Sequence, residues 1–305
     1  MAVNIEKLAW GGWPNCYRMS NGEAELVVTS DVGPRIMRYG FVGGQNFFKV
    51  FEDQLGKSRE RDWQFRGGHR VWLAPESFEK TYAPDNDPVE IEITADALIA
   101  TQPVEPLTGL RKQLVISLAP RGSGVTVNHR MQNTLSEPIT LSVWALTMLA
   151  QDGVAVTGFP PRGRHEDVLA PTNPLVMWAF TDLRDPRWTF LEKYLVLRHD
   201  RNNPAHTKLG LFNPRTWGAY FLNGELFLKT CHAHSSKSYP DMGCSYETFA
   251  SAEMLEIETL SPLFTLREGE WAEHAENWSL YRDFQSFDYY SDEALDKSLL
   301  PLLTW

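Results

Sequence analysis

Two glutamates at alternate positions are the first residues in this sequence that could carry chemistry. In the segment 253–262, Glu256 and Glu258 fall on one face of a strand, while Leu255 and Ile257 fall on the other. Same-face neighbours on a strand lie roughly 6.5–7 Å apart. At that separation each carboxylate raises the pKa of the other, and burial raises it further, which is one route to a general base near neutral pH. The alternative is a solvated outer face of a sheet.

The segment GGHRVWLAPE (67–76) places an arginine beside an indole. If it is a strand, Arg70 and Trp72 share one face and Val71 lies on the other. A guanidinium donates hydrogen bonds in a fixed fork, and an indole offers a flat apolar platform, so the pair suits a sugar ring. The alternative is a surface cation–π pair. His69 falls on the Val71 face, where a structural histidine is the competing interpretation.

His232 and His234 also share a strand face, and a His-x-His pair can chelate one metal ion. The carboxylate that a cupin-like metal site requires shortly afterwards is missing, because position 238 is Ser. We therefore expect no metal, although a metal-dependent β-barrel enzyme remains an alternative. Asp241 and Glu247 follow as candidates for contacts to substrate hydroxyls, unless Asp241 only forms a turn.

The elements that must position these residues are predicted to be strands. Period-2 alternation between Gly, Pro, Asn and Asp turns is typical of antiparallel sheets, and Asn223-Gly224 predicts a tight hairpin. Ser291 can cap one short C-terminal helix, which Pro301 would end. We predict an all-β, single domain over 1–305 with a loop-rich insertion around 158–215. The strand-like segments are 24–33, 89–102, 112–124, 125–133, 139–149, 217–234 and 253–266.

Composition excludes several classes of function. The formal charge is −10, from 29 Lys plus Arg against 39 Asp plus Glu, so nucleic acid and anionic membrane surfaces are poor partners. Neither the N-terminal segment nor any later one predicts a signal peptide or an apolar span. Cys16, Cys231 and Cys244 lack metal spacing and fit a reducing compartment, so we expect a cytoplasmic protein. No phosphate-binding glycine loop occurs, and no cofactor is expected.

Taken together, four segments resemble the galactose mutarotase-like, or aldose 1-epimerase, superfamily. In 25–48 the chain passes through Gly33, Arg35 and Ile36 to the pair Asn46-Phe47, which is similar to the first strands of that superfamily. Segments 67–76, 125–149 and 255–280 are similar to the next strand, the central hairpin and the closing strands. The resemblance covers roughly 20–285 and implies an antiparallel β-supersandwich that binds a small-molecule carbohydrate on the concave face of its larger sheet.

The resemblance also implies roles for residues. In the mutarotases a Glu in a Glu-Thr step takes the anomeric proton, and Glu258 before Thr259 matches it. The family's acid is a His on the central hairpin, where this chain has 143–146 (Val-Trp-Ala-Leu), so His69 is the substitute that we predict and His232 another possibility. The predicted substrate contacts are Arg35, Asn46, Arg70, Trp72, Glu76, His232, Asp241, Glu247 and Glu256.

Three other functions stay open at this point. A non-catalytic sugar-binding or sensing protein would share the groove and lack turnover, which agrees with the missing hairpin histidine. A metal-dependent enzyme would use His232 and His234. An interaction module would use the loop-rich middle of the chain. The sequence leaves the oligomeric state and the identity of the sugar undetermined.

Overall fold

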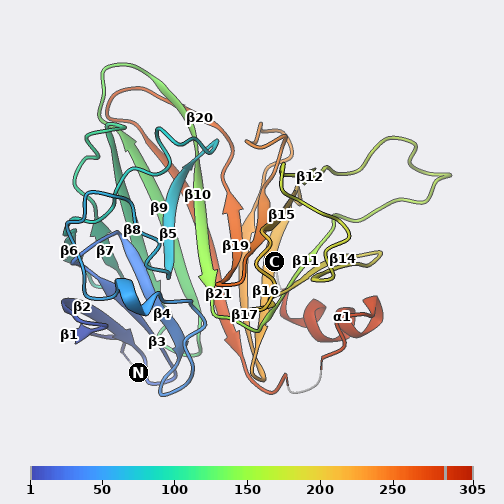
Figure 1. Cartoon of the computed structure of the whole chain (residues 1–305), viewed down its shortest axis with the longest axis horizontal. Helices are drawn as coiled ribbons and strands as arrows, with labels where there is room; N and C mark the ends of the chain where they lie inside the picture. The colour runs from blue at the N-terminus through green and yellow to red at the C-terminus, as the bar shows by residue number, and fades with distance from the viewer. Residues whose placement is uncertain (1, 285–286, 304–305) are drawn as a thin grey trace.

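The computed structural model describes residues 2–284 and 287–303, and within them almost all regular structure is antiparallel β-sheet (Figure 1). The larger sheet contains eleven strands. In spatial order they are β1 (Asn4–Trp10), β2 (Trp13–Ser20), β3 (Ala24–Thr29), β4 (Arg35–Phe41), β5 (His69–Ala74), β10 (Ile139–Leu149), β19 (Leu255–Leu260), β18 (Tyr246–Ala250), β15 (Thr207–Leu211) and β12 (Leu175–Met177), with β20 (Phe264–Leu266) paired to β10.

The smaller sheet contains ten strands among the described residues. Their order is β13 (Trp188–Phe190), β14 (Tyr194–Arg198), β11 (Val154–Gly158), β16 (Arg215–Leu222), β17 (Glu225–His232), β21 (Trp271–Tyr281), β9 (Val125–Asn133), β8 (Leu110–Leu118), β7 (Leu98–Thr101) and β6 (Glu90–Ile93). The predicted hairpin is confirmed: Leu222 pairs with Glu225, and Asn223 and Gly224 both have positive φ, as a tight two-residue turn requires.

The main hydrophobic core lies between the two sheets. It combines inward residues of the larger sheet, such as Val71 and Leu73, with residues of the smaller sheet, such as Leu114, Phe227 and Trp278. Strand β8 alternates buried and half-buried positions, because one of its faces meets the core and the other meets water. Strand β10 is buried on both faces from Leu141 onward, so its sequence is apolar except for Ser142 and Thr147 and does not alternate.

The predicted C-terminal helix is confirmed as α1 (Asp292–Leu299), with the Ser291 hydroxyl accepting a hydrogen bond from the Ala294 amide. It buries Leu295 and Leu299 in a second apolar cluster against the smaller sheet (Figure 1). Short 3-10 turns occupy η1 (Glu52–Gln54) and η2 (Leu300–Leu302). Neither α1 nor any other helix of the described part is long and apolar enough to cross a membrane.

The segment predicted as a loop-rich insertion, 158–215, is more regular than its composition indicates. It contains β12, β13, β14 and β15, which add strands to the edges of both sheets. Only the connection between β11 and β12 extends away from the sheets as a long loop (Figure 1). Three- to five-residue strands between Pro, Asn and Asp give a weak local signal, and their pairing with distant strands determines their structure.

Candidate functional site

The middle of the larger sheet brings the predicted chemistry to one face. Strands β5, β10 and β19 are neighbours, and alternate residues on each point away from the smaller sheet. Arg70 and Trp72 come from β5, Trp144 from β10, and Glu256 and Glu258 from β19. The inward residues of the same strands enter the core, so the alternation that predicted two faces for each segment is confirmed.

A cavity of about 470 Å³ lies on this outer face. Aromatic side chains form much of its wall, and a few charged groups converge on it, which is the usual composition of a small-molecule site. We call this cavity the groove. Its lining residues are Phe51, Phe65, Arg70, Trp72, Glu76, Tyr82, Trp144, Leu146, Met148, Trp178, Phe180, His206, Lys208, Phe249, Ser251, Glu253, Met254 and Glu256.

Glu258 lies beside the groove within a buried charged cluster. The Lys208 ammonium donates to Glu258 Oε2 at 2.8 Å and lies 2.7 Å from Glu247 Oε2. The Trp144 indole N–H donates to the same Glu258 oxygen at 2.8 Å. Glu258 Oε1 has no hydrogen-bond partner among the described residues, although the side chain is fully buried. One oxygen is therefore held in place while the other is available to accept a proton.

The acids of this face differ in their protonation. Burial, together with the neighbouring Glu258 charge, raises the pKa of Glu256 to about 8. Burial also raises the pKa of Glu247 well above its usual range, against the opposing effect of Lys208. Although burial lowers the pKa of Lys208, the charges of Glu247 and Glu258 raise it overall, so the ammonium form persists. Glu256 is thus a carboxylic acid at neutral pH that faces the groove.

Arg70 occupies an unusual position between two indoles. Its guanidinium carbon lies 3.8 Å from the ring centroid of Trp72 and 4.5 Å from that of Trp63. The side chain is only 1% exposed, and none of its three guanidinium nitrogens has a hydrogen-bond partner among the described residues. Trp72 in turn meets Trp144 at 5.4 Å between ring centroids. The arginine–indole pair predicted for 67–76 is buried in the groove and is not a surface contact.

Two further predicted residues join this face. Glu76 lines the groove and accepts a hydrogen bond from the Tyr82 hydroxyl at 2.5 Å. Asp241 lies next to Glu247, and burial raises its pKa, with the charges of Glu258 and Glu76 acting in the same direction. Arg70, Trp72, Glu76, Asp241, Glu247, Glu256 and Glu258 are therefore the predicted site residues that the structure gathers around one face.

Arg35 and Asn46 do not fit the role of substrate contacts, because their polar atoms are already used. Arg35 is fully buried and pairs with Asp85 through two nitrogens, while its remaining donors bind backbone carbonyls. The Asn46 side chain accepts from the amides of Tyr39 and Phe48 and donates to the carbonyl of Met37. Both residues hold the turns around β4 in place.

His69 does not fit the role of the general acid, because it points to the opposite face of β5 from Arg70. It is fully buried between the sheets, where its Nε2 lies 2.6 Å from Nε2 of His129 and its Nδ1 bonds Thr147. Burial lowers the pKa of His69, which keeps it neutral. His129 is also fully buried here.

Glu276 completes the buried polar cluster behind the groove. Its carboxylate pairs with Lys229 at 2.8 Å and accepts from the Trp278 indole at 2.9 Å. Its Oε2 lies 4.0 Å from Nε2 of both His69 and His129, a grouping of metal-ligand types. The two imidazole nitrogens bond each other and Lys229 neutralises the carboxylate, so the cluster is satisfied as it stands.

His232 and His234 lie outside the groove. Both are exposed, at the end of β17 in the smaller sheet and just after it. The group of metal-ligating side chains within the described residues does not include them. His232 therefore does not fit a substrate contact in the groove, and the geometry offers little to a metal-dependent enzyme built on this pair.

Several residues in and beside the groove were not predicted from the sequence. Lys208 lies in β15 and His206 just before it, while Trp178 follows β12, all within the segment predicted as loops. Trp63, which packs on Arg70 beside the groove, lies in the irregular stretch before β5. Trp144 lies in the segment 143–146, where the resemblance to the mutarotases implied a histidine. The alternation of residues in β15, with Lys208 between Thr207 and Leu209, could have indicated a strand that turns Lys208 to one face. The strand is too short for this pattern to be distinctive.

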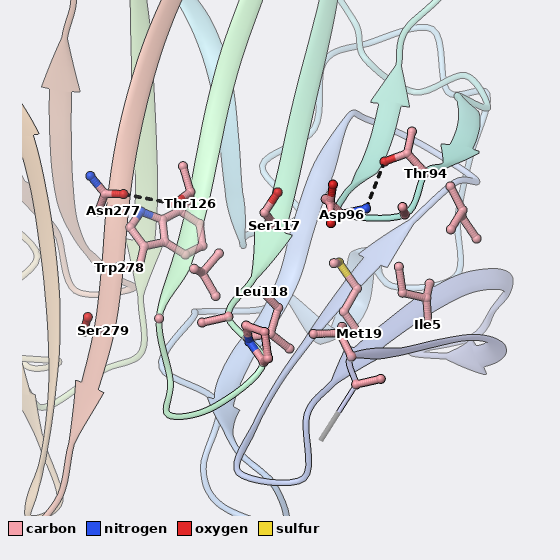
Figure 2. Close-up of a pocket in the computed structure, with 18 residues that line it drawn as sticks. Ile5, Met19, Thr94, Asp96, Ser117, Leu118, Thr126, Asn277, Trp278 and Ser279 are labelled. Carbon is pink, nitrogen blue, oxygen red and sulfur yellow. Dashed lines mark hydrogen bonds between the residues drawn. The ribbon is translucent and has the colours of Figure 1, made fainter.

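A second hollow, of about 830 Å³, lies at the edge of the core near β1 and β2 (Figure 2). Met19, Leu118 and Trp278 form apolar parts of its wall. Among the described residues that line it, Asp96 is the one titratable side chain. Without a pair of acid and base groups, this hollow is a weaker candidate for catalysis than the groove.

Two antiparallel sheets packed face to face, with a polar groove on the outer face of the larger one, define a β-supersandwich. This is the galactose mutarotase-like fold, and solved structures of low identity share it. A galactose mutarotase-like protein from Lactobacillus casei aligns with a TM-score of 0.54 over 91% of this chain and 100% of its own, at 10% identity. One from Clostridium acetobutylicum aligns with a TM-score of 0.54 over 92% and 99%, at 11% identity.

The same fold occurs in a longer protein. A TPR-domain containing protein from Parabacteroides distasonis aligns with a TM-score of 0.56 over 90% of this chain but 48% of its own, at 15% identity. No protein-family model and no curated sequence matches this chain. The predicted fold is therefore confirmed, and activity must be argued from the site.

Proposed function

We propose that this protein binds a carbohydrate in the groove and interconverts its anomers, as an aldose 1-epimerase does. Glu258 is the general base and Glu256 the general acid. The observation that carries the proposal is the pair of same-face carboxyl groups with unequal environments. Glu258 accepts from Lys208 and Trp144 and keeps one oxygen without a partner, while Glu256 is protonated at neutral pH and faces the groove.

The reaction needs two coupled proton transfers. Glu258 removes the proton from the anomeric hydroxyl while Glu256 donates its proton to the ring oxygen, and the bond between C1 and that oxygen breaks to give the open-chain aldehyde. Rotation about the C1–C2 bond presents the other face of the carbonyl. The ring closes when Glu256 takes back the proton and Glu258 returns one to O1. The side chains of Trp72 and Trp144 supply apolar surface for the sugar ring.

Polarimetry tests this proposal. Freshly dissolved α-glucose, α-galactose and other aldoses are followed with wild-type protein and with Glu258→Gln and Glu256→Gln variants. We expect wild type to accelerate mutarotation of at least one aldose, and each variant to lose 10²-fold or more of that acceleration. His206→Asn is the matched control, because His206 is the histidine at the rim of the groove. If His206→Asn loses activity and Glu256→Gln keeps it, the general acid is His206 and not Glu256.

A non-catalytic sugar-binding protein is the second candidate. The specific observation in its favour is that β10 presents Trp144 and Leu146 to the groove, where mutarotases are expected to present a histidine. This candidate requires sugar-induced thermal stabilisation without any acceleration of mutarotation. It also requires that Glu256→Gln leave sugar affinity nearly unchanged, because no proton transfer depends on that carboxyl group.

A further inference from the structure

The groove has unsatisfied hydrogen-bond donors at one end. They are the guanidinium of Arg70, which lines the groove, and the indole N–H of Trp63, which packs on Arg70 beside the lining residues. Both are buried, and neither has an acceptor within the described part of the chain. The nearby Arg35 is the opposite case, since Asp85 and backbone carbonyls satisfy its donors. The described residues thus provide hydrogen-bond acceptors for the guanidinium of Arg35 and none for that of Arg70. Buried donors without acceptors are rare and costly, so an acceptor from outside the chain is the natural partner.

The charge of Arg70 is also uncompensated. Asp85 acts electrostatically on Arg70, but it already forms an ion pair with Arg35 at 2.9 Å. Glu256 also acts electrostatically on Arg70, but burial and the Glu258 charge keep it protonated near neutral pH. An anionic acceptor fits the buried donors of Arg70 better than a neutral hydroxyl does, because it would also supply a counter-charge.

The other end of the groove offers an acceptor. Glu258 Oε1 has no partner among the described residues. In the sheet register Arg70 pairs with Leu146, which pairs with Glu258, so the backbone positions of Arg70 and Glu258 lie two strands apart, roughly 10 Å. One pyranose ring with a hydrogen bond at each end can bridge that span. A complementary ligand has an anionic group at one end and a hydroxyl donor at the other.

We infer that the sugar is a uronic acid, whose carboxylate binds Arg70 and Trp63 while its anomeric hydroxyl meets Glu258. This inference rests on the proposed function and specifies its substrate class. A single planar guanidinium fork matches a carboxylate in bidentate geometry. A phosphate dianion fits less well, because among the described residues that line the groove Arg70 is the one cation without an ion pair, while Lys208 is already paired with Glu247 and Glu258. Trp63 covers Arg70, so its indole shifts as the ligand enters.

Calorimetric titration of the full chain tests the inference. The ligands are D-glucuronate and D-galacturonate, with glucose and galactose as neutral controls and their 6-phosphates as the alternative anions. We expect one uronate to bind at least tenfold more tightly than its neutral parent. In Arg70→Met the ratio of the uronate affinity to the affinity for the neutral parent sugar should fall to within threefold of one. In Arg70→Lys the same ratio should be at least threefold lower than in wild type, because an ammonium lacks the planar fork of the guanidinium. Arg70→Lys keeps the test valid if the Met variant does not fold.

The outcomes separate the two proposals. Binding of a neutral sugar without a uronate preference overturns the inference and leaves the proposed function standing. Tighter binding of a 6-phosphate than of the uronate overturns the assignment of a carboxylate. A uronate preference that survives in both Arg70 variants also overturns it. If wild-type protein binds no sugar in any of these titrations, the proposed function fails, and the inference fails with it.

Discussion

Replacing Lys208 with methionine isolates the charged cluster that holds the base. Lys208 is 5% exposed and lies 2.7 Å from Glu247 and 2.8 Å from Glu258. At an effective dielectric constant of about 20, each contact contributes roughly 6 kcal/mol of gross attraction. Desolvation of the three groups offsets much of that sum. Breaking a buried ion pair by removing one partner costs about 3–5 kcal/mol, which is the loss in unfolding free energy that we expect near pH 8.

The pH dependence of this loss is the sharper part of the prediction. Without the ammonium, the folded-state pKa of Glu247, which burial already raises, rises further, so the variant loses stability as pH increases. The difference from wild type should therefore shrink towards pH 5, where protonated carboxyl groups need no counter-charge. Urea denaturation followed by tryptophan fluorescence at pH 5 and pH 8 measures both values. The double variant with Glu247→Gln should recover part of the loss at pH 8.

Lys193→Met is the matched control, because Lys193 pairs with Asp296 on the exposed surface. Its unfolding free energy should not change measurably, since exposed ion pairs contribute little. If Lys208→Met loses less than about 1 kcal/mol at pH 8, or loses the same amount at both pH values, the buried cluster does not stabilise the fold as described.

Three other perturbations test separate parts of the structure. Because Glu256 must be protonated to act as the acid and burial raises its pKa to about 8, the rate of mutarotation should fall as pH rises through about 8, and a flat rate from pH 6 to 10 would contradict this role. Burial lowers the pKa of His274 to about 3, so the unfolded chain takes up a proton at this histidine at a higher pH than the folded chain does. The free energy of unfolding should therefore fall by a few kcal/mol between pH 6.5 and 3, and His274→Gln should flatten that slope in urea titrations. Gly210→Ala would place Cβ 2.5 Å from Cys244 Sγ and should cost about 1–3 kcal/mol, whereas Gly124→Ala, whose nearest contact is 3.5 Å, should melt like wild type.

Alternation was enough to predict the faces of two key strands. In β19 Glu256 and Glu258 alternate with Leu255 and Ile257, and in β5 Arg70 and Trp72 alternate with Val71 and Leu73, so the common face of each pair could be derived from the period of a strand. The same rule placed His69 on the apolar face. Its selection as the acid came from the family's need for a histidine and not from its position in the strand.

Other features could not be derived because they depend on distant pairing. Strand β10 is buried on both faces from Leu141 onward, so its mostly apolar sequence does not reveal that Trp144 faces the groove and donates to Glu258. Lys208 comes from a five-residue strand in a segment with the composition of loops. Arg35 and Arg70 look equivalent in the sequence. Only the structure shows that Asp85, far along the chain, satisfies the first and leaves the second without a partner.

The two sides of the β10–β19 pair carry separate polar clusters. On the outer side Lys208 joins Glu247 and Glu258, and on the inner side Lys229 joins Glu276 among the buried histidines. Within the described part of the chain, no buried polar atom of the inner cluster lacks a hydrogen-bond partner, whereas the outer cluster keeps carboxylate oxygens of Glu247 and Glu258 without one beside a cavity. This difference is the physical reason for assigning a structural role to the inner cluster and ligand binding to the outer cluster.

A crystal structure of the protein with a bound sugar tests the central claim most directly. We expect the ring to lie in the groove against Trp72 and Trp144, with its anomeric oxygen within hydrogen-bond distance of Glu258 Oε1. A sugar seated in the hollow beside Trp278, or in the groove with Glu258 Oε1 still without a partner, would contradict the account.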